Sequence, residues 1–170
     1  MKFSNGAWLM KSGVEPYYTN ELRSYEISEQ LVTLYAPFQA IRHRGDTLTG
    51  PLFTIEFSSP AEEVIKLKIT HHKQRKAYPA FELNESTNVL KTIDSAQYLE
   101  ISTGKTTVKI HKDTWLIEYF YNKKLLTFSS GRSLGMMMVN QDKHMCESLN
   151  LSVGEKIYGL GERFTNFIRN

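Results

Sequence analysis

Histidine and cysteine side chains are the first candidates for chemistry in this sequence. His144 and Cys146 lie two residues apart in a polar stretch, and such a pair could act as a thiol nucleophile with its general base. His71 and His72 are adjacent, so in a strand they point to opposite faces of the sheet and cannot bind the same metal ion. No wider motif supports either pair. The sequence therefore predicts no metal site and no cofactor.

Carboxylates are the second class of candidates, because enzymes that hydrolyse a glycosidic bond use two of them, about 5–5.5 Å or 6.5–9.5 Å apart. Glu62 and Glu63 are adjacent in a predicted loop, while Glu100 and Glu118 fall on the predicted solvent faces of strands. Nothing in their spacing selects a catalytic pair, and charged side chains at such positions are ordinarily solvated surface groups. Up to Asn150 the sequence predicts no catalytic residue.

The elements that position these side chains are strands, because the dominant hydropathy pattern has a period of two. In Val64–Ile69 the apolar residues alternate with Lys66 and Lys68, as expected for a strand with one solvent-exposed face. Similar runs are rich in β-branched and aromatic residues, which favour strands. They are predicted at 22–27, 31–35, 52–57, 98–102, 106–110, 114–121, 125–128 and 135–139.

Residues typical of turns separate these runs and indicate which strands are neighbours in the sheet. Ser102–Lys105 contains a glycine and predicts a hairpin turn, and 111–113 and 121–124 predict the next two turns. Residues 97–128 are therefore expected to form an antiparallel meander, and the polar stretch Asn140–Ser148 a long loop. About ten strands at this spacing predict an all-β fold, an antiparallel β-sandwich, in a single domain over residues 1–170.

The composition limits the class of protein further. The 170 residues are 41% hydrophobic and 12% aromatic, which is enough to build one domain core. The 21 basic and 18 acidic residues give a net charge of +3, too little to indicate a nucleic-acid partner. One cysteine excludes a disulfide framework. No secretory signal and no apolar run near the roughly 20 residues of a membrane span is present, so we expect a soluble cytoplasmic protein with no membrane partner.

The most unusual passage is the last one, Gly154–Phe164, in which two glycines precede an acid, an arginine and an aromatic residue. Gly159 and Gly161 provide backbone freedom for a tight bend or a close approach. The spacing matches no phosphate-binding loop. From the residues alone, a glycine-bent strand in which Glu162 and Arg163 hydrogen-bond to neighbouring backbone is favoured over a ligand-binding loop.

The run V-G-E-K-I-Y-G-L-G-E-R-F, residues 153–164, strongly resembles the end of the N-terminal domain of glycoside hydrolase family 31. The opening Met1–Met10 resembles the start of the α-xylosidase branch of that family, and residues 131–135 and 147–153 fit the same pattern. The resemblance implies a β-sandwich of the galactose mutarotase-like kind, a supersandwich, placed before a catalytic β/α barrel. In that family two aspartates of the barrel act by the retaining mechanism.

A β/α barrel needs about 250 residues by itself, so the resemblance implies an N-terminal domain without catalytic residues. Residues 154–170 would lead toward the barrel, which is the implied partner within the same parent chain and which would bind the sugar, an α-xyloside or a related glycoside. In the family a loop of this domain approaches the sugar pocket. Glu162, Arg163 and Phe164 are the residues best placed to belong to that pocket wall, and a structural carboxylate at Glu162 is the alternative.

The function that the resemblance implies is a non-catalytic domain that stabilises a retaining α-glycosidase, of the α-xylosidase kind, and helps to shape its sugar pocket. A stand-alone carbohydrate-binding module is the alternative, with Trp8, Tyr17, Tyr18 or Trp115 stacking on sugar rings, although Trp115 is expected in the core. A mutarotase is a third possibility and would need an acid and a base across the sugar. The uncovered apolar residues Phe164, Phe167 and Ile168 also predict self-association, and hence a possible homo-oligomer.

Overall fold

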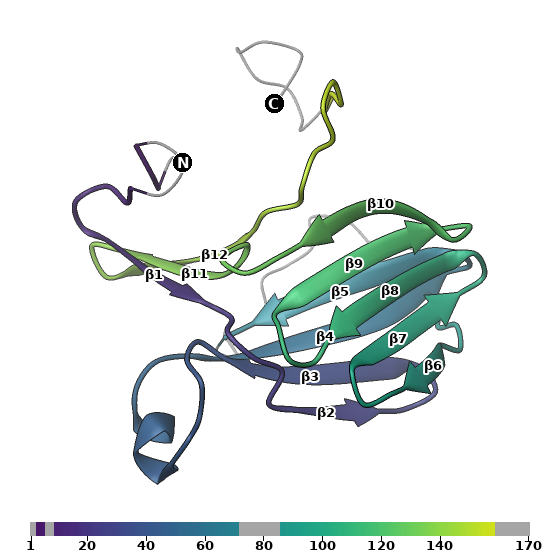
Figure 1. The fold of residues 1–170 in the computed structure, drawn as a ribbon, viewed down its shortest axis with the longest axis horizontal. Coiled ribbons are helices and arrows are strands. Elements are labelled where there is room, and N and C mark those ends of the chain that lie inside the picture. Colours follow the sequence, from purple (N-terminus) through teal and green to yellow (C-terminus); the bar gives the residue numbers. More distant parts are fainter. Residues whose placement is uncertain (1–2, 6–8, 72–85, 159–170) are drawn as a thin grey trace.

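The computed structural model describes residues 3–5, 9–71 and 86–158. Within these ranges the chain forms twelve strands and one short 3-10 helix, and every strand pairing is antiparallel. The strands make three sheets, two of which stack face to face as a sandwich (Figure 1). The predicted all-β fold class is therefore confirmed.

The four-stranded sheet has the order β2-β3-β4-β5 and the five-stranded sheet the order β10-β9-β8-β7-β6. The strands of the first sheet are β2 (Ser24–Ile27), β3 (Leu31–Pro37), β4 (Leu52–Ala61) and β5 (Val64–Thr70). Those of the second are β6 (Lys91–Asp94), β7 (Tyr98–Thr103), β8 (Thr106–His111), β9 (Leu116–Tyr121) and β10 (Lys124–Ser129). The second sheet is a continuous meander, so the predicted meander is confirmed and is extended by β6.

Alternation of side chains decides which face of each strand is buried. In β5, Ile65, Leu67 and Ile69 are half-buried and pack against the core. The residues between them face outward, where the Lys68 ammonium lies 2.6 Å from the Glu56 carboxylate on the neighbouring strand. The same period in both sheets sends one apolar face inward from each.

The core lies between the two stacked sheets and also takes up residues from the third sheet. Its largest side chains are fully buried, and each would contribute roughly 1.5–3 kcal/mol through its removal from water. Both main sheets contribute in equal measure, with Leu134 and Met136 added from outside them. The largest fully buried side chains are Val32, Leu34, Phe53, Ile55, Phe57, Leu99, Ile101, Val108, Ile110, Ile117, Leu134 and Met136.

The third sheet has the order β1-β11-β12 and consists of β1 (Val14–Tyr18), β11 (Leu134–Val139) and β12 (Asp142–Glu147). It lies beside the sandwich (Figure 1). Strands β1 and β11 approach closely at Gly135, where a β-carbon would lie 2.2 Å from the carbonyl oxygen of Tyr17. Only glycine fits this position.

The predicted loop over Asn140–Ser148 is wrong, because most of it is strand β12. The hairpin between β11 and β12 has only two turn residues, Asn140 and Gln141, with φ angles of 48° and 79°. Paired left-handed residues are typical of the tight turns that suit the twist of a hairpin, and asparagine tolerates that conformation. β12 is a polar edge strand, so its weak alternation at His144 and Cys146 was hidden by charged neighbours.

None of the described helices is long and apolar enough to cross a membrane.

Candidate functional site

The predicted pocket-wall residues Glu162, Arg163 and Phe164 lie outside the described residues, as do Phe167, Ile168 and Trp8. The site described below is therefore built from the remainder of the chain. It centres on an open groove of about 610 Å³, called the Arg132 groove here. The residues that line it are Pro16, Tyr18, Thr19, Asn20, Phe38, Asp113, Thr114, Trp115, Gly131 and Arg132.

One wall of the Arg132 groove is formed where β1 ends beside the start of β11. The backbone N–H and the side-chain hydroxyl of Thr19 both donate hydrogen bonds to the carbonyl oxygen of Leu134, at 2.9 and 3.0 Å. Thr19 is buried, so this double contact fixes the adjacent residues Tyr18 and Asn20. The tight turn before Leu134 holds Arg132 at a φ angle of 68° and exposes its side chain.

The opposite wall comes from the turn between β8 and β9, which carries Asp113, Thr114 and Trp115. Trp115 is only 4% exposed and belongs to the core, as expected from the sequence, although it precedes the strand. Its indole N–H has no hydrogen-bond partner among the described residues. A buried donor without an acceptor costs free energy, about 1–3 kcal/mol.

The electrostatics of the Arg132 groove combine one cation and one anion. Arg132 and Asp113 are both exposed, and neither forms an ion pair in the part of the chain that the structure describes. Burial raises the pKa of the Tyr18 hydroxyl, a nearby thiol adds to this, and the Arg132 guanidinium opposes it. Tyr18 is therefore a neutral hydrogen-bonding group at any physiological pH.

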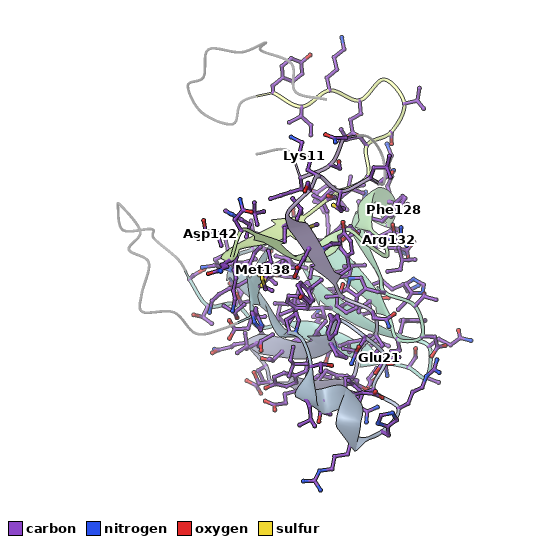
Figure 2. The ribbon with its side chains drawn as sticks, turned by 90° about the vertical axis from the view of Figure 1, so that its left-hand side faces the viewer. Lys11, Glu21, Phe128, Arg132, Met138 and Asp142 are labelled. Atoms are coloured by element: carbon purple, nitrogen blue, oxygen red, sulfur yellow. The ribbon has the colours of Figure 1, made fainter. Side chains whose placement is uncertain are left out.

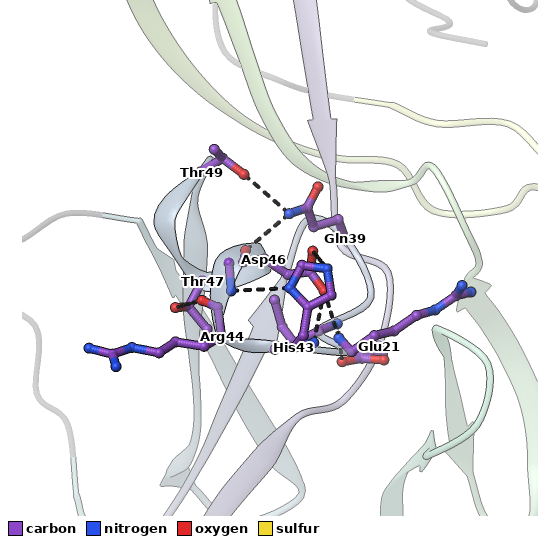
Figure 3. Close-up of polar contacts among 10 residues, drawn as sticks. Glu21, Gln39, His43, Arg44, Asp46, Thr47 and Thr49 are labelled. Atoms are coloured by element: carbon purple, nitrogen blue, oxygen red, sulfur yellow. Dashed lines mark hydrogen bonds and ion pairs between the residues drawn. The ribbon is translucent and has the colours of Figure 1, made fainter.

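A second polar cluster lies in the long connection between β3 and β4, around the 3-10 helix η1 (Arg44–Leu48) (Figure 3). One Asp46 carboxylate oxygen accepts the backbone N–H groups of Arg42 and His43, at 2.8 and 3.0 Å. These bonds lower the pKa of Asp46. The His43 Nδ1 atom accepts the Gly45 N–H at 3.1 Å, which completes a capping box.

The hydrogen bonds of His43 and Asp46 therefore organise a charged loop. Beneath it lies a small, mainly apolar pocket of about 220 Å³, whose wall includes Phe38, Ile41, Pro51 and Leu52. Gly50, at a φ of 76°, packs directly on the Phe38 ring, so a side chain there would have to displace it.

His144 and Cys146 share one side of β12, two positions apart. The Cys146 thiol donates to the Gly135 carbonyl oxygen at 3.5 Å, and burial raises its pKa. The His144 ring instead packs against Phe3, with the ring centroids 5.9 Å apart. A thiol with a raised pKa and no hydrogen bond to an imidazole is a poor nucleophile, so the structure does not support the thiol–imidazole pair.

One pair of titratable groups was not anticipated from the sequence. His111 Nε2 and Glu118 Oε2 lie 2.8 Å apart on adjacent strands, and both side chains are half-buried. Lys109 extends over the Tyr98 ring on the same sheet, 4.1 Å from its centroid. Such cross-strand contacts stabilise a sheet face. The described residues contain no cluster of three or more His, Cys, Asp or Glu residues that could hold a metal ion.

Solved structures with the same architecture define the class of fold. The chain matches Listeria monocytogenes protein lmo2446 with a TM-score of 0.68 and 15% identity, over 91% of this chain and 14% of that one. It matches a cycloalternan-forming enzyme from Listeria monocytogenes, solved with a pentasaccharide substrate, with the same TM-score, identity and coverage. At this identity the likeness shows the fold alone: a β-sandwich domain that occupies a small part of a much longer chain.

Sequence comparisons then give the family. Residues 54–170 match the galactose mutarotase-like N-terminal domain of glycosyl hydrolase family 31, and the chain belongs to this family. An α-xylosidase from Lactiplantibacillus pentosus, XylQ, is 32% identical over the whole chain, and an α-xylosidase from Emericella nidulans is 29% identical. The chain spans 23% and 25% of the lengths of these two relatives. The resemblance inferred from the closing motif is confirmed.

Of the residues that line the Arg132 groove, the sequence indicated Tyr18 and Trp115 as possible sugar-stacking residues but did not single out Asp113 or Arg132. Asp113 and Arg132 lie in two turns 19 positions apart in the chain, where charged side chains are ordinary. Their juxtaposition depends on how the β8–β9 turn meets the end of β1, which is a tertiary relationship. The only local signal was the Gly131-Arg132-Ser133 turn itself.

Proposed function

We propose that this chain is the non-catalytic N-terminal domain of a longer retaining α-glycosidase that acts on α-xylosides. In it the sandwich would stabilise the catalytic barrel of the same polypeptide. The observation that carries the proposal is the pair of α-xylosidase relatives, which align with the whole chain while extending about four times its length.

Residues 154–170 are the proposed connection to the barrel, with Glu162, Arg163 and Phe164 in the wall of the sugar pocket. The described start of this connection supports the idea. After β12 the chain leaves the sandwich (Figure 1), and Leu149, Val153 and Tyr158 are 52%, 106% and 55% exposed. Apolar side chains that are exposed along one stretch of chain favour burial against a neighbouring domain.

A hydrolysis assay tests whether catalysis requires the longer protein. We expect the 170-residue chain to leave p-nitrophenyl α-xyloside intact, and a protein of the relatives' length that begins with this sequence to hydrolyse it with retention of configuration. Turnover by the 170-residue chain would refute the proposal, as would a longer protein that is inactive on α-xylosides while active on another glycoside class.

The proposed pocket wall is tested in the longer protein. Phe164→Ala and Arg163→Ala should each reduce kcat/KM for the α-xyloside by about tenfold or more, as expected for loss of one substrate-positioning contact. Leu48→Ala is the matched control, because Leu48 is 81% exposed on the far connection between β3 and β4. Unchanged kinetics in all three variants would remove residues 163 and 164 from the pocket wall.

A further inference from the structure

We propose that the Arg132 groove is a binding site for a neutral oligosaccharide built of pyranose rings. The inference goes beyond the proposed function, because it concerns ligand binding by the sandwich itself and depends on no residue outside the described ranges. It rests on four properties of the groove: its size, its unengaged polar groups, its charge balance and its rigidity.

The size of the groove suits a small ligand. Its volume of about 610 Å³ lies within the range of roughly 300–1,000 Å³ that is typical of ligand sites. The groove is open along one side, which suits a chain of rings better than a single enclosed molecule. Tyr18 and Phe38 contribute aromatic surface to the lining. The Phe38 ring is held by an edge-on contact with Tyr17, with the centroids 5.5 Å apart.

Four polar side chains of the groove have no partner among the described residues. The side chains of Tyr18, Asn20, Asp113 and Arg132 form no hydrogen bond or ion pair within the described ranges. Together they offer guanidinium and amide donors, carboxylate and amide acceptors, and a hydroxyl that can do both. A sugar hydroxyl is itself both a donor and an acceptor, so adjacent hydroxyls on a pyranose ring can satisfy this mixture with bidentate contacts.

The charge balance argues against a charged ligand. Arg132 contributes one positive charge and Asp113 one negative charge, and no other lining residue is ionised at neutral pH. An anion would be attracted by Arg132 and repelled by Asp113, and a cation would experience the reverse. A neutral ligand with many hydroxyls meets no such penalty.

The groove is also organised before a ligand arrives, which lowers the entropic cost of binding. Thr19 is anchored twice on Leu134, and Arg132 is held in a left-handed turn that most residues avoid. Strained residues of this kind are frequent at binding sites.

The test is an NMR titration of the 170-residue chain with xylotriose, maltotriose and inorganic phosphate. We expect at least one trisaccharide to shift the amides of residues 18–20, 113–115 and 131–132, and phosphate to leave them unchanged. Trp8→Phe leaves a single indole, so its N–H resonance reports directly on Trp115. Arg132→Ala and Asp113→Ala should each weaken binding about tenfold, the loss expected for one hydrogen bond to a charged group.

Matched controls separate the groove from general surface charge. Arg44→Ala removes an arginine that points away from the η1 loop (Figure 3), and Asp142→Ala removes an aspartate on the opposite side of the molecule from Arg132 (Figure 2). Both should bind like the original chain. The proposal is overturned if neither trisaccharide shifts the groove amides up to about 10 mM, if phosphate alone does, or if all four variants bind alike. None of these outcomes depends on α-xyloside hydrolysis, so this proposal and the proposed function can fail separately.

Discussion

The Lys112 ammonium lies 2.6 Å from the Asp94 carboxylate and joins two turns of the five-stranded sheet to the edge of the other sheet. Tyr25, on edge strand β2, donates its hydroxyl to the second Asp94 oxygen at 2.8 Å and accepts a hydrogen bond from Lys112 at 2.9 Å. Lys112 also donates to the carbonyl oxygen of Ser95 at 2.6 Å. The contact therefore links β2 to β6, which are edge strands of two different sheets.

This contact predicts a loss of stability in acid. The hydrogen bonds from Lys112 and Tyr25 lower the pKa of Asp94 below its ordinary value. A carboxylate with a lowered pKa stabilises the fold above its unfolded-state pKa of about 3.9, and this contribution is lost as the pH falls through the folded-state pKa. Urea unfolding measured from pH 6 down to pH 2.5 should show a smaller loss in the free energy of unfolding for Asp94→Asn than for the original chain. Asp142→Asn is the control and should follow the original chain; a parallel loss in all three would contradict the prediction.

The strands were predictable where local pattern and burial agree. β5 alternates with few exceptions because one face meets the core and the other meets water, and the meander strands β7 to β9 follow the same rule. β1 was missed because Pro16 interrupts its pattern. A proline is tolerated there because β1 is an edge strand.

The close approach at Gly135 predicts that this residue cannot be enlarged. In Gly135→Ala the new methyl group would meet the Tyr17 carbonyl oxygen at 2.2 Å, and β1 would have to move away from β11. Overpacking of this kind costs about 1–3 kcal/mol, and we expect that loss in the free energy of unfolding. Gly131→Ala is the matched control, because nothing lies within 4 Å of its β-carbon position. Equal stability of the two variants would show that β1 and β11 separate at no cost.

The carboxylate of Glu147 links β12 to the five-stranded sheet and predicts the opposite pH dependence from Asp94. Tyr119 donates its hydroxyl to Glu147 at 3.2 Å, and burial raises the pKa of Glu147 above its ordinary value. A raised carboxyl pKa means that ionisation destabilises the fold once the pH exceeds the unfolded-state value of about 4.3. Glu147→Gln should therefore raise the free energy of unfolding at pH 7. The gain should be less than about 1 kcal/mol because the side chain is partly exposed. At pH 3.5 the two proteins should unfold together, and a destabilised Gln variant at pH 7 would contradict the assignment.

The site was harder to predict than the strands, for a physical reason. Asp113 and Arg132 sit on exposed turns, where a sequence gives no periodic signal, and their meeting depends on the anchoring of Thr19 on Leu134. The family information came from the glycine-rich closing motif together with residues 1–10, 131–135 and 147–153. The local sequence pattern predicts which face of a strand is buried. A groove between turns depends instead on contacts between residues about 100 positions apart.

The environment of Cys146 predicts an unreactive thiol. Burial raises its pKa, and a backbone hydrogen bond with Gly135 opposes this only in part. The thiolate is the reactive form, so its population at pH 7.5 should be smaller than in an unfolded peptide, whose thiol pKa is about 8.5. We expect Ellman's reagent to modify Cys146 at least about tenfold more slowly in the native chain than in urea. His144→Ala should leave the native rate unchanged, because the imidazole does not hydrogen-bond to the thiol. A native rate that exceeds the unfolded one, and falls in His144→Ala, would instead restore the thiol–imidazole nucleophile that the sequence alone leaves open.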